Sequence, residues 1–143
     1  MVSNSDGSQA DWLRDKSNVF GGWLPPLTFA FGEKPMTPEE FANCFAKEKD
    51  SLLQLYFDAD SRSDVARQIA SLSGDAAQSA ALRKIVDGIL RDVLYTVLLG
   101  LDGSGSIGGT QRLYKLYDED GTLLTGKLES FAWERFHGPQ KHM

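Results

Sequence analysis

The sequence contains a single cysteine, Cys44, and two histidines, His137 and His142, in 143 residues. One cysteine excludes an internal disulfide, and its place in a predicted helix indicates a small buried side chain more than a reactive thiol. The histidines are separated by the Gly138-Pro139 break, so they do not share a helix face. No metal ligand is therefore predicted. The lack of disulfides favours a reducing, cytoplasmic compartment.

Basic residues are outnumbered by acidic ones, and long apolar runs are lacking. Lys and Arg number 15 against 20 Asp and Glu, which gives a formal net charge of -5. This balance argues against nucleic acid and anionic membranes as partners, because both attract excess positive charge. The longest apolar run, near Val93 to Leu99, is far shorter than the roughly 20 residues of a membrane-spanning helix. The N-terminus lacks the basic and apolar regions of a secretory signal. We expect no nucleic-acid and no membrane partner.

The remaining composition indicates one mainly helical α+β domain. Hydrophobic residues make up 41% and charged residues 24%, which is ordinary for a globular protein. Residues 1–18 are rich in Ser, Asn, Asp and Gly, so a flexible N-terminus is predicted. Residues 19–138 are expected to form a single globular domain, followed by a flexible tail at residues 139–143.

An apolar stretch opens the predicted domain. Large apolar side chains occur here among glycines and a Pro-Pro pair, without helical period: Phe20, Trp23, Leu24, Leu27, Phe29 and Phe31. The alternation from Leu27 to Phe31 is typical of a short extended segment packed on the core. Alternatively, Trp23 and the prolines line an exposed docking surface.

Two helices are predicted next. Thr37-Pro38-Glu39-Glu40 has the residues of a capping box with proline at the first helical position, so a helix is expected from there to about Phe57. Its apolar residues near one face are Phe41, Phe45, Leu52 and Tyr56. A short helix capped by Ser61 or Ser63 follows, and it carries Val65, Ile69 and Leu72.

The longest helical pattern runs from Asp75 to Leu101. Apolar residues in steps of three and four define one face: Leu82, Ile85, Val86, Ile89, Val93, Val97 and Leu101. From Val93 onward the segment is apolar in nearly every direction. We therefore predict a three-helix core in which this helix lies buried at the centre of the molecule.

The C-terminal part changes period. Five glycines lie between positions 100 and 109 and indicate a connector. The residues from Gln111 to Tyr117 and from Thr122 to Thr125 favour β structure and flank an Asp-Gly turn, so a β-hairpin is predicted. A short terminal helix is expected after it, with an apolar stripe of Leu128, Phe131, Ala132 and Phe136.

Two motifs resemble ligand sites. The segment from Gly103 to Gly108 matches G-x-G-x-x-G, but it follows a predicted helix and precedes a predicted strand, the reverse of a dinucleotide site. Asp118, Asp120 and Gly121 resemble part of an EF-hand loop, yet leucine and lysine stand at two essential ligand positions. Connector glycines and a hairpin turn are the preferred interpretations, and an anion nest in the glycine loop is the alternative.

Catalytic chemistry is not indicated by any complete motif. A small hydrolase or ligand-binding enzyme using the glycine-rich loop 102–109, with Asp102 and Ser104, is retained as one hypothesis. No catalytic residue and no cofactor is assigned.

Aromatic and acidic residues near the C-terminus indicate a protein-binding surface. Trp133 falls away from the apolar stripe on the helical wheel, which allows partial exposure beside Glu129 and Glu134. An exposed tryptophan with acidic neighbours would suit a basic partner. The preferred interpretation is that the hairpin covers Trp133, because large aromatic side chains are usually buried. The candidate partner-binding residues are Trp23, Tyr114, Tyr117, Asp118, Glu119, Asp120, Glu129, Trp133 and Glu134.

The segment from Asp92 to Gly138, with DVLYTVLLGLDGSGSIGG and ESFAWERFHG, resembles small bacterial proteins, some of which are immunity partners of secreted or contact-delivered toxins. The resemblance implies a bacterial cytosolic binder and assigns no functional residue. The leading hypothesis is a small acidic protein-binding module, an immunity or inhibitor protein that neutralises a basic toxin or effector by direct binding. A structural subunit of a homo-oligomer is a further alternative, and the oligomeric state itself is not predicted.

Overall fold

The computed structural model describes residues 34–139, and this part of the chain is helical. The expectations for the flexible N-terminus, the apolar stretch from 19 to 31 and the last four residues lie outside the described residues. Within 34–139 the helices are α2 (Pro38–Tyr56), α3 (Asp64–Leu72), α4 (Ala76–Asp102) and α5 (Leu128–Phe136).

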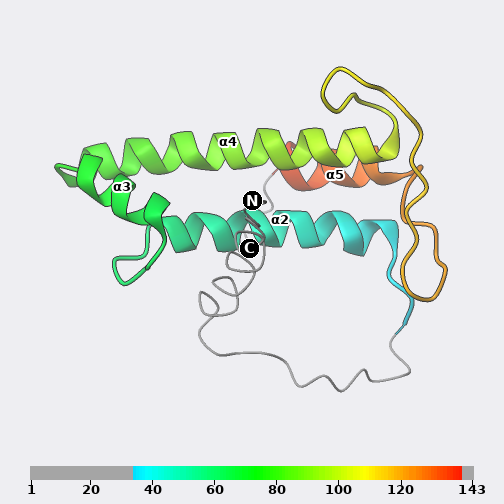
Figure 1. Ribbon diagram of the computed structural model, residues 1–143, viewed down its shortest axis with the longest axis horizontal. Coiled ribbons are helices and arrows are strands. Elements are labelled where there is room, and N and C mark those ends of the chain that lie inside the picture. Colours follow the sequence, from blue (N-terminus) through cyan, green and yellow to red (C-terminus); the bar gives the residue numbers. More distant parts are fainter. Residues whose placement is uncertain (1–33, 140–143) are drawn as a thin grey trace, which may run out of the picture.

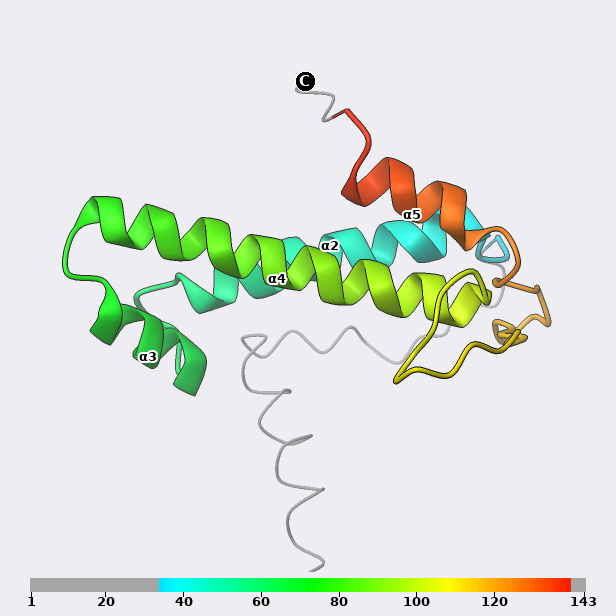
Figure 2. The ribbon, with the colours of Figure 1, turned by 90° about the horizontal axis from the view of Figure 1, so that it is seen from above.

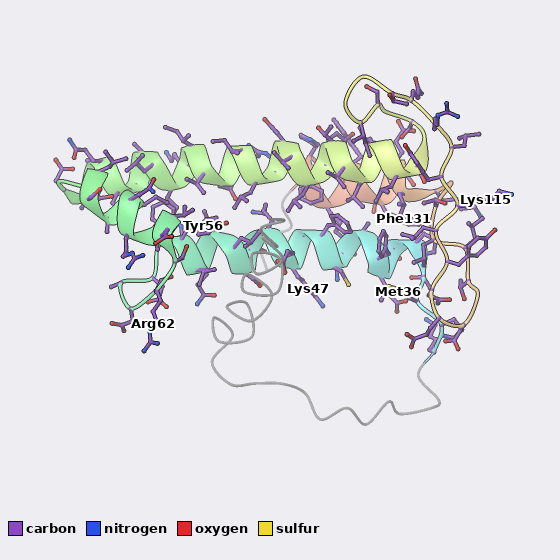
Figure 3. The ribbon with its side chains drawn as sticks, viewed as in Figure 1. Met36, Lys47, Tyr56, Arg62, Lys115 and Phe131 are labelled. Carbon is purple, nitrogen blue, oxygen red and sulfur yellow. The ribbon has the colours of Figure 1, made fainter. Side chains whose placement is uncertain are left out.

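Helices α2, α4 and α5 pack against one another at one end of the molecule, and each of the three contacts the other two. Helices α2 and α5 run in one direction and α4 runs in the opposite direction (Figure 1). Helix α3 joins α2 to α4 at the other end, and Figure 2 shows α3 and α5 on opposite sides of α4. Arg62, just before α3, and Lys115, in the long connector before α5, mark these two ends (Figure 3).

Helix α2 begins as its sequence predicts. The Thr37 hydroxyl accepts a hydrogen bond from the Glu40 amide at 3.1 Å, and the Glu40 carboxylate accepts one from the Thr37 amide at 2.7 Å. These bonds form a complete capping box, with proline in the first turn. The Thr37 amide is also the main reason why the pKa of the Glu40 carboxyl is lowered. The predicted helix start is therefore confirmed.

The core is small and lies where α2, α4 and α5 meet. Its buried members are Ala42, Leu98, Leu128, Ala132 and Phe136, and half-buried residues such as Phe131 pack around them (Figure 3). The apolar stripe predicted for the terminal helix faces this core, which confirms that helix and its buried side. Beyond the core, Lys49 of α2 binds Asp87 of α4 at 2.6 Å. Burial lowers the pKa of Lys49, but its hydrogen bonds to Asp87 and Asp50 outweigh this effect and raise it.

The extent of the long helix was predicted correctly, but its position in the molecule was not. The side of α4 that contacts α2 and α5 is centred on Leu98, which is fully buried, with Leu94 and Tyr95 beside it. Ile85 and Val93, on the predicted buried face, are exposed. Apolar residues cover more than half of the circumference of α4, so periodicity indicated a helix without indicating which side would be packed. The predicted centrally buried rod is therefore wrong.

The predicted β-hairpin, and with it the α+β class, is also wrong. Residues 34–139 contain no β-strand, and pairing in the hairpin region is limited to the isolated bridge between Tyr117 and Leu123. The turn itself forms, but the Thr125 hydroxyl then donates to the Tyr114 carbonyl at 2.6 Å and accepts from the Leu116 amide at 3.3 Å. These two backbone groups are thus satisfied by a side chain, and the ladder between the strands does not continue.

Leu98→Ala tests the position of the core. We expect it to lower the free energy of unfolding by about 2–5 kcal/mol, because a fully buried leucine leaves a cavity. The matched control is Leu72→Ala on α3, where the leucine is exposed and the loss should stay within about 0.5 kcal/mol. Urea denaturation measures both changes. Equal losses would contradict a core centred on Leu98.

Candidate functional site

Asp102 connects the end of α4 to the start of α5. Its side chain is buried, and its two carboxylate oxygens accept hydrogen bonds from the amides of Gly126 and Glu129, the latter at 3.1 Å. The residue before α5, Lys127, supplies no side-chain cap. Asp102 therefore satisfies the free amides at the start of α5 from a distant part of the chain, as an N-cap residue does locally.

An open hollow of ≈ 650 Å³ lies beside this connection. It is bordered by Tyr95 of α4 and by residues of α5 and the segment before it. The complete lining is Tyr95, Asp102, Gly126, Lys127, Glu129, Ser130, Phe131, Trp133 and Glu134. Three of the lining side chains are acidic and one is basic, so acidic groups outnumber basic ones around the hollow.

Trp133 is held on this surface by a row of rings. The Trp133 ring stacks on the His137 ring at 5.0 Å and 25°, and the Tyr95 ring meets the His137 ring edge-on at 4.6 Å. Trp133 nevertheless has 55% of its surface exposed. The indole is thus supported by an aromatic neighbour while much of its surface stays available to a ligand.

The candidate partner-binding residues fall into separate groups. Glu129, Trp133 and Glu134 lie together at the hollow. Trp133 is exposed, so the preferred expectation that the hairpin covers it is wrong. Trp23 lies outside the described residues. The other candidates, from Tyr114 to Asp120, belong to the connector before α5, where both tyrosines are exposed.

Asp118 has a structural role in this connector. One of its carboxylate oxygens accepts from the Thr122 amide at 2.6 Å and the Asp120 amide at 3.1 Å. The other oxygen accepts from the Met36 amide at 3.2 Å, which ties the turn to the residues just before α2. The Thr122 amide is the largest cause of a lowered pKa of the Asp118 carboxyl, with burial opposing it and the Met36 amide adding to it.

The glycine-rich loop folds back on the end of α4. Gly103 has φ 81° and ends the helix, and the Gly105 amide donates to the Leu99 carbonyl at 3.0 Å. Ile107 lies directly over Gly100, at a place where a β-carbon would collide with it. These contacts account for the glycines by close packing and turn geometry. They give no support to the anion nest.

Sequence reasoning missed three contributors to the site: Tyr95, His137 as an aromatic support, and Asp102 as the cap of α5. Tyr95 and His137 are 42 positions apart in the sequence, and Asp102 and Glu129 are 27 apart. No local pattern joins residues at such separations. The available signals were the absence of a good capping residue at Lys127 and the four-residue spacing of Trp133 and His137, which places neighbours on one side of a helix.

Asp102→Ala tests the connection between α4 and α5. We expect a loss of about 1.5–3 kcal/mol in the free energy of unfolding, because two backbone amides lose a charged acceptor. Amide hydrogen exchange should rise most at residues 126–131. Asp92→Ala, at an exposed position of the same helix, is the control. A loss no larger than that of the control would show that Asp102 does not hold α5.

Asp118 should make stability depend on acid pH. Its carboxyl has a lowered pKa in the folded protein, so its contribution is full above the unfolded pKa of about 3.9 and is lost as pH falls through the folded pKa. We expect Asp118→Asn to be less stable than the parent at pH 7, with the difference shrinking below about pH 4. Urea denaturation across this range measures it. A difference independent of pH would contradict this role.

Comparison with protein-family models, curated proteins and solved structures finds no match to the chain. The resemblance to small bacterial proteins therefore stays a prediction, and the function is argued from the residues of the site.

Proposed function

We propose that the protein is a protein-binding module that takes a basic segment of its partner into the hollow beside Trp133. The observation that carries this proposal is the exposed but ring-supported indole of Trp133 with Glu129 and Glu134 beside it in the lining. A lysine or arginine side chain over an indole gains cation–π attraction. Nearby carboxylates add charge-assisted hydrogen bonds to the same cation.

The site has the composition of a binding hot spot. Tryptophan is among the residues that contribute most to protein interfaces, especially when the surroundings exclude water. Its stacking on His137 limits the conformational freedom that binding would otherwise cost. The net charge of -5 adds a long-range attraction for a basic partner.

The expectation that the long helix is buried at the centre is wrong, so it gives no support to this proposal. The proposal rests on α5 and the end of α4 instead. No observation favours the enzyme hypothesis built on the glycine loop, because both oxygens of Asp102 are engaged by backbone amides.

The immunity or inhibitor role belongs to the same proposal. Neutralising a basic toxin would require only tight binding through such a site, without chemistry.

A cytoplasmic location is also proposed, because a single cysteine cannot form an internal disulfide and disulfides are typical of oxidising compartments. No helix within residues 34–139 has both the length and the hydrophobicity to cross a membrane.

Trp133→Ala tests the binding site. The probe is a lysine- and arginine-rich peptide, titrated into the protein labelled with ¹⁵N, with its glutamate analogue as a second probe. We expect the basic peptide, and not its glutamate analogue, to shift the amide signals of residues 126–137. Its affinity should fall as the salt concentration rises. Trp133→Ala should weaken binding at least about tenfold, because hot-spot residues contribute about 2 kcal/mol or more.

Tyr117→Ala, another exposed aromatic residue, is the control and should leave the affinity unchanged. Equal binding by Trp133→Ala and the parent, or perturbation confined to the connector, would overturn the site. The inhibitor role has a separate test, in which basic proteins encoded beside the gene are mixed with this chain at micromolar concentration. The absence of any complex would count against that role.

A further inference from the structure

One side of α4 exposes a row of aliphatic residues. Ile85 is 58% exposed, Ile89 56% and Val93 54%. Steps of four place these three side chains in a ridge along one side of the helix. Half-buried apolar residues flank the ridge, namely Leu82, Val86, Leu90 and Val97. We call the three exposed residues the α4 ridge.

The α4 ridge points away from the core. Leu98, Leu94 and Tyr95 mark the side of α4 that packs on α2 and α5. Counted at 100° per residue, Ile89 lies on the side of the helix opposite Leu98. Single exposed aliphatic residues are normal, but a continuous row on one helix is typical of a surface that another segment covers.

The chain itself contains a segment of matching chemistry. No charged residue occurs between Lys16 and Glu33, and residues 20–31 include three phenylalanines, one tryptophan and two leucines. This segment lies outside the described residues. An uncharged aromatic segment can cover aliphatic side chains without burying an unpaired charge.

The length of the chain allows the contact. Described residues begin at Lys34, and the Met36 amide binds Asp118 in the connector that follows α4. The starting point is thus at the same end of the molecule as the end of α4 (Figure 3). Val93 and Ile85 lie about 14 and 26 Å along the helix from Asp102. Residues 23–33 can extend to about 36–40 Å, and Ile89 lies about 20 Å along the helix from Asp102. The part of the segment from Phe20 to Trp23 can therefore reach the ridge after the rest has passed round the bundle.

We propose that the part of this segment from Phe20 to Trp23 packs over the α4 ridge of the same molecule. A second copy of the chain is the competing occupant, since a helix ridge can also pack on its own twin. A tethered segment acts at an effective concentration in the millimolar range. It therefore occupies the ridge in preference to a second copy at the lower concentrations of a dilute solution.

The test uses the full chain with Trp12→Phe and Trp133→Phe, which leave Trp23 as the only tryptophan. We expect its fluorescence maximum to be blue-shifted and its quenching by acrylamide to be weak, because the indole is shielded from water. Ile89→Lys in this background should move the maximum to that of free tryptophan and raise the quenching. Leu72→Lys, at an exposed leucine on α3, is the matched control and should change neither.

Circular dichroism verifies that the helices persist, and Val93→Gln replaces Ile89→Lys if that variant unfolds. Sedimentation velocity at two concentrations identifies the occupant. A monomer whose Trp23 signal responds to the ridge variant supports the proposal. An exposed Trp23 in the parent, or a shielded Trp23 indifferent to the ridge variant, overturns it. A dimer that the ridge variant dissociates also overturns it, in favour of a second copy.

Discussion

The carboxylate of Asp102 is the interaction on which the placement of α5 depends. A helix of nine residues is not stable alone in water, and a long connector separates α5 from α4. Asp102 supplies acceptors for the free amides at the start of α5, while the apolar stripe of α5 is buried against α2 and α4. One buried side chain and one apolar stripe thus determine where the terminal helix lies.

The surface at the hollow follows from this placement. Because α5 is fixed at its start and buried along one side, its outer side has a defined orientation. Glu129 and Trp133 are four residues apart on this helix, and neighbours at this spacing lie on one side. His137, at the end of α5, stacks on the indole, and Tyr95 of α4 contacts the His137 ring in turn. A partner would meet groups already in position, which reduces the entropy lost on binding.

The unequal lengths of the helices explain why apolar surface stays exposed. Helix α4 has 27 residues and α5 has nine, so α5 covers only part of one side of its partner. Helix α2 covers a second side, and the short α3 packs near the beginning of α4. Of the remaining side of α4, the glycine-rich loop covers only the end, where Ile107 lies over Gly100, and the part from Ile85 to Val93 exposes the α4 ridge. The same geometry therefore produces both the packed end that carries the hollow and an apolar side along the long helix.

The sequence by itself determined what depends on near neighbours. The capping box before α2 joins residues three apart, and the stripe of α5 repeats within two turns, so both are readable from spacing alone. Tertiary structure decided the rest. Periodicity cannot select a side on a helix that is apolar around most of its circumference, and the face of α4 was therefore chosen by α2 and α5. Thr125 bonds to groups 9 and 11 residues away in the connector. Asp102 accepts from backbone amides 24 and 27 residues away, which come within hydrogen-bonding distance only after α5 has packed beside the end of α4.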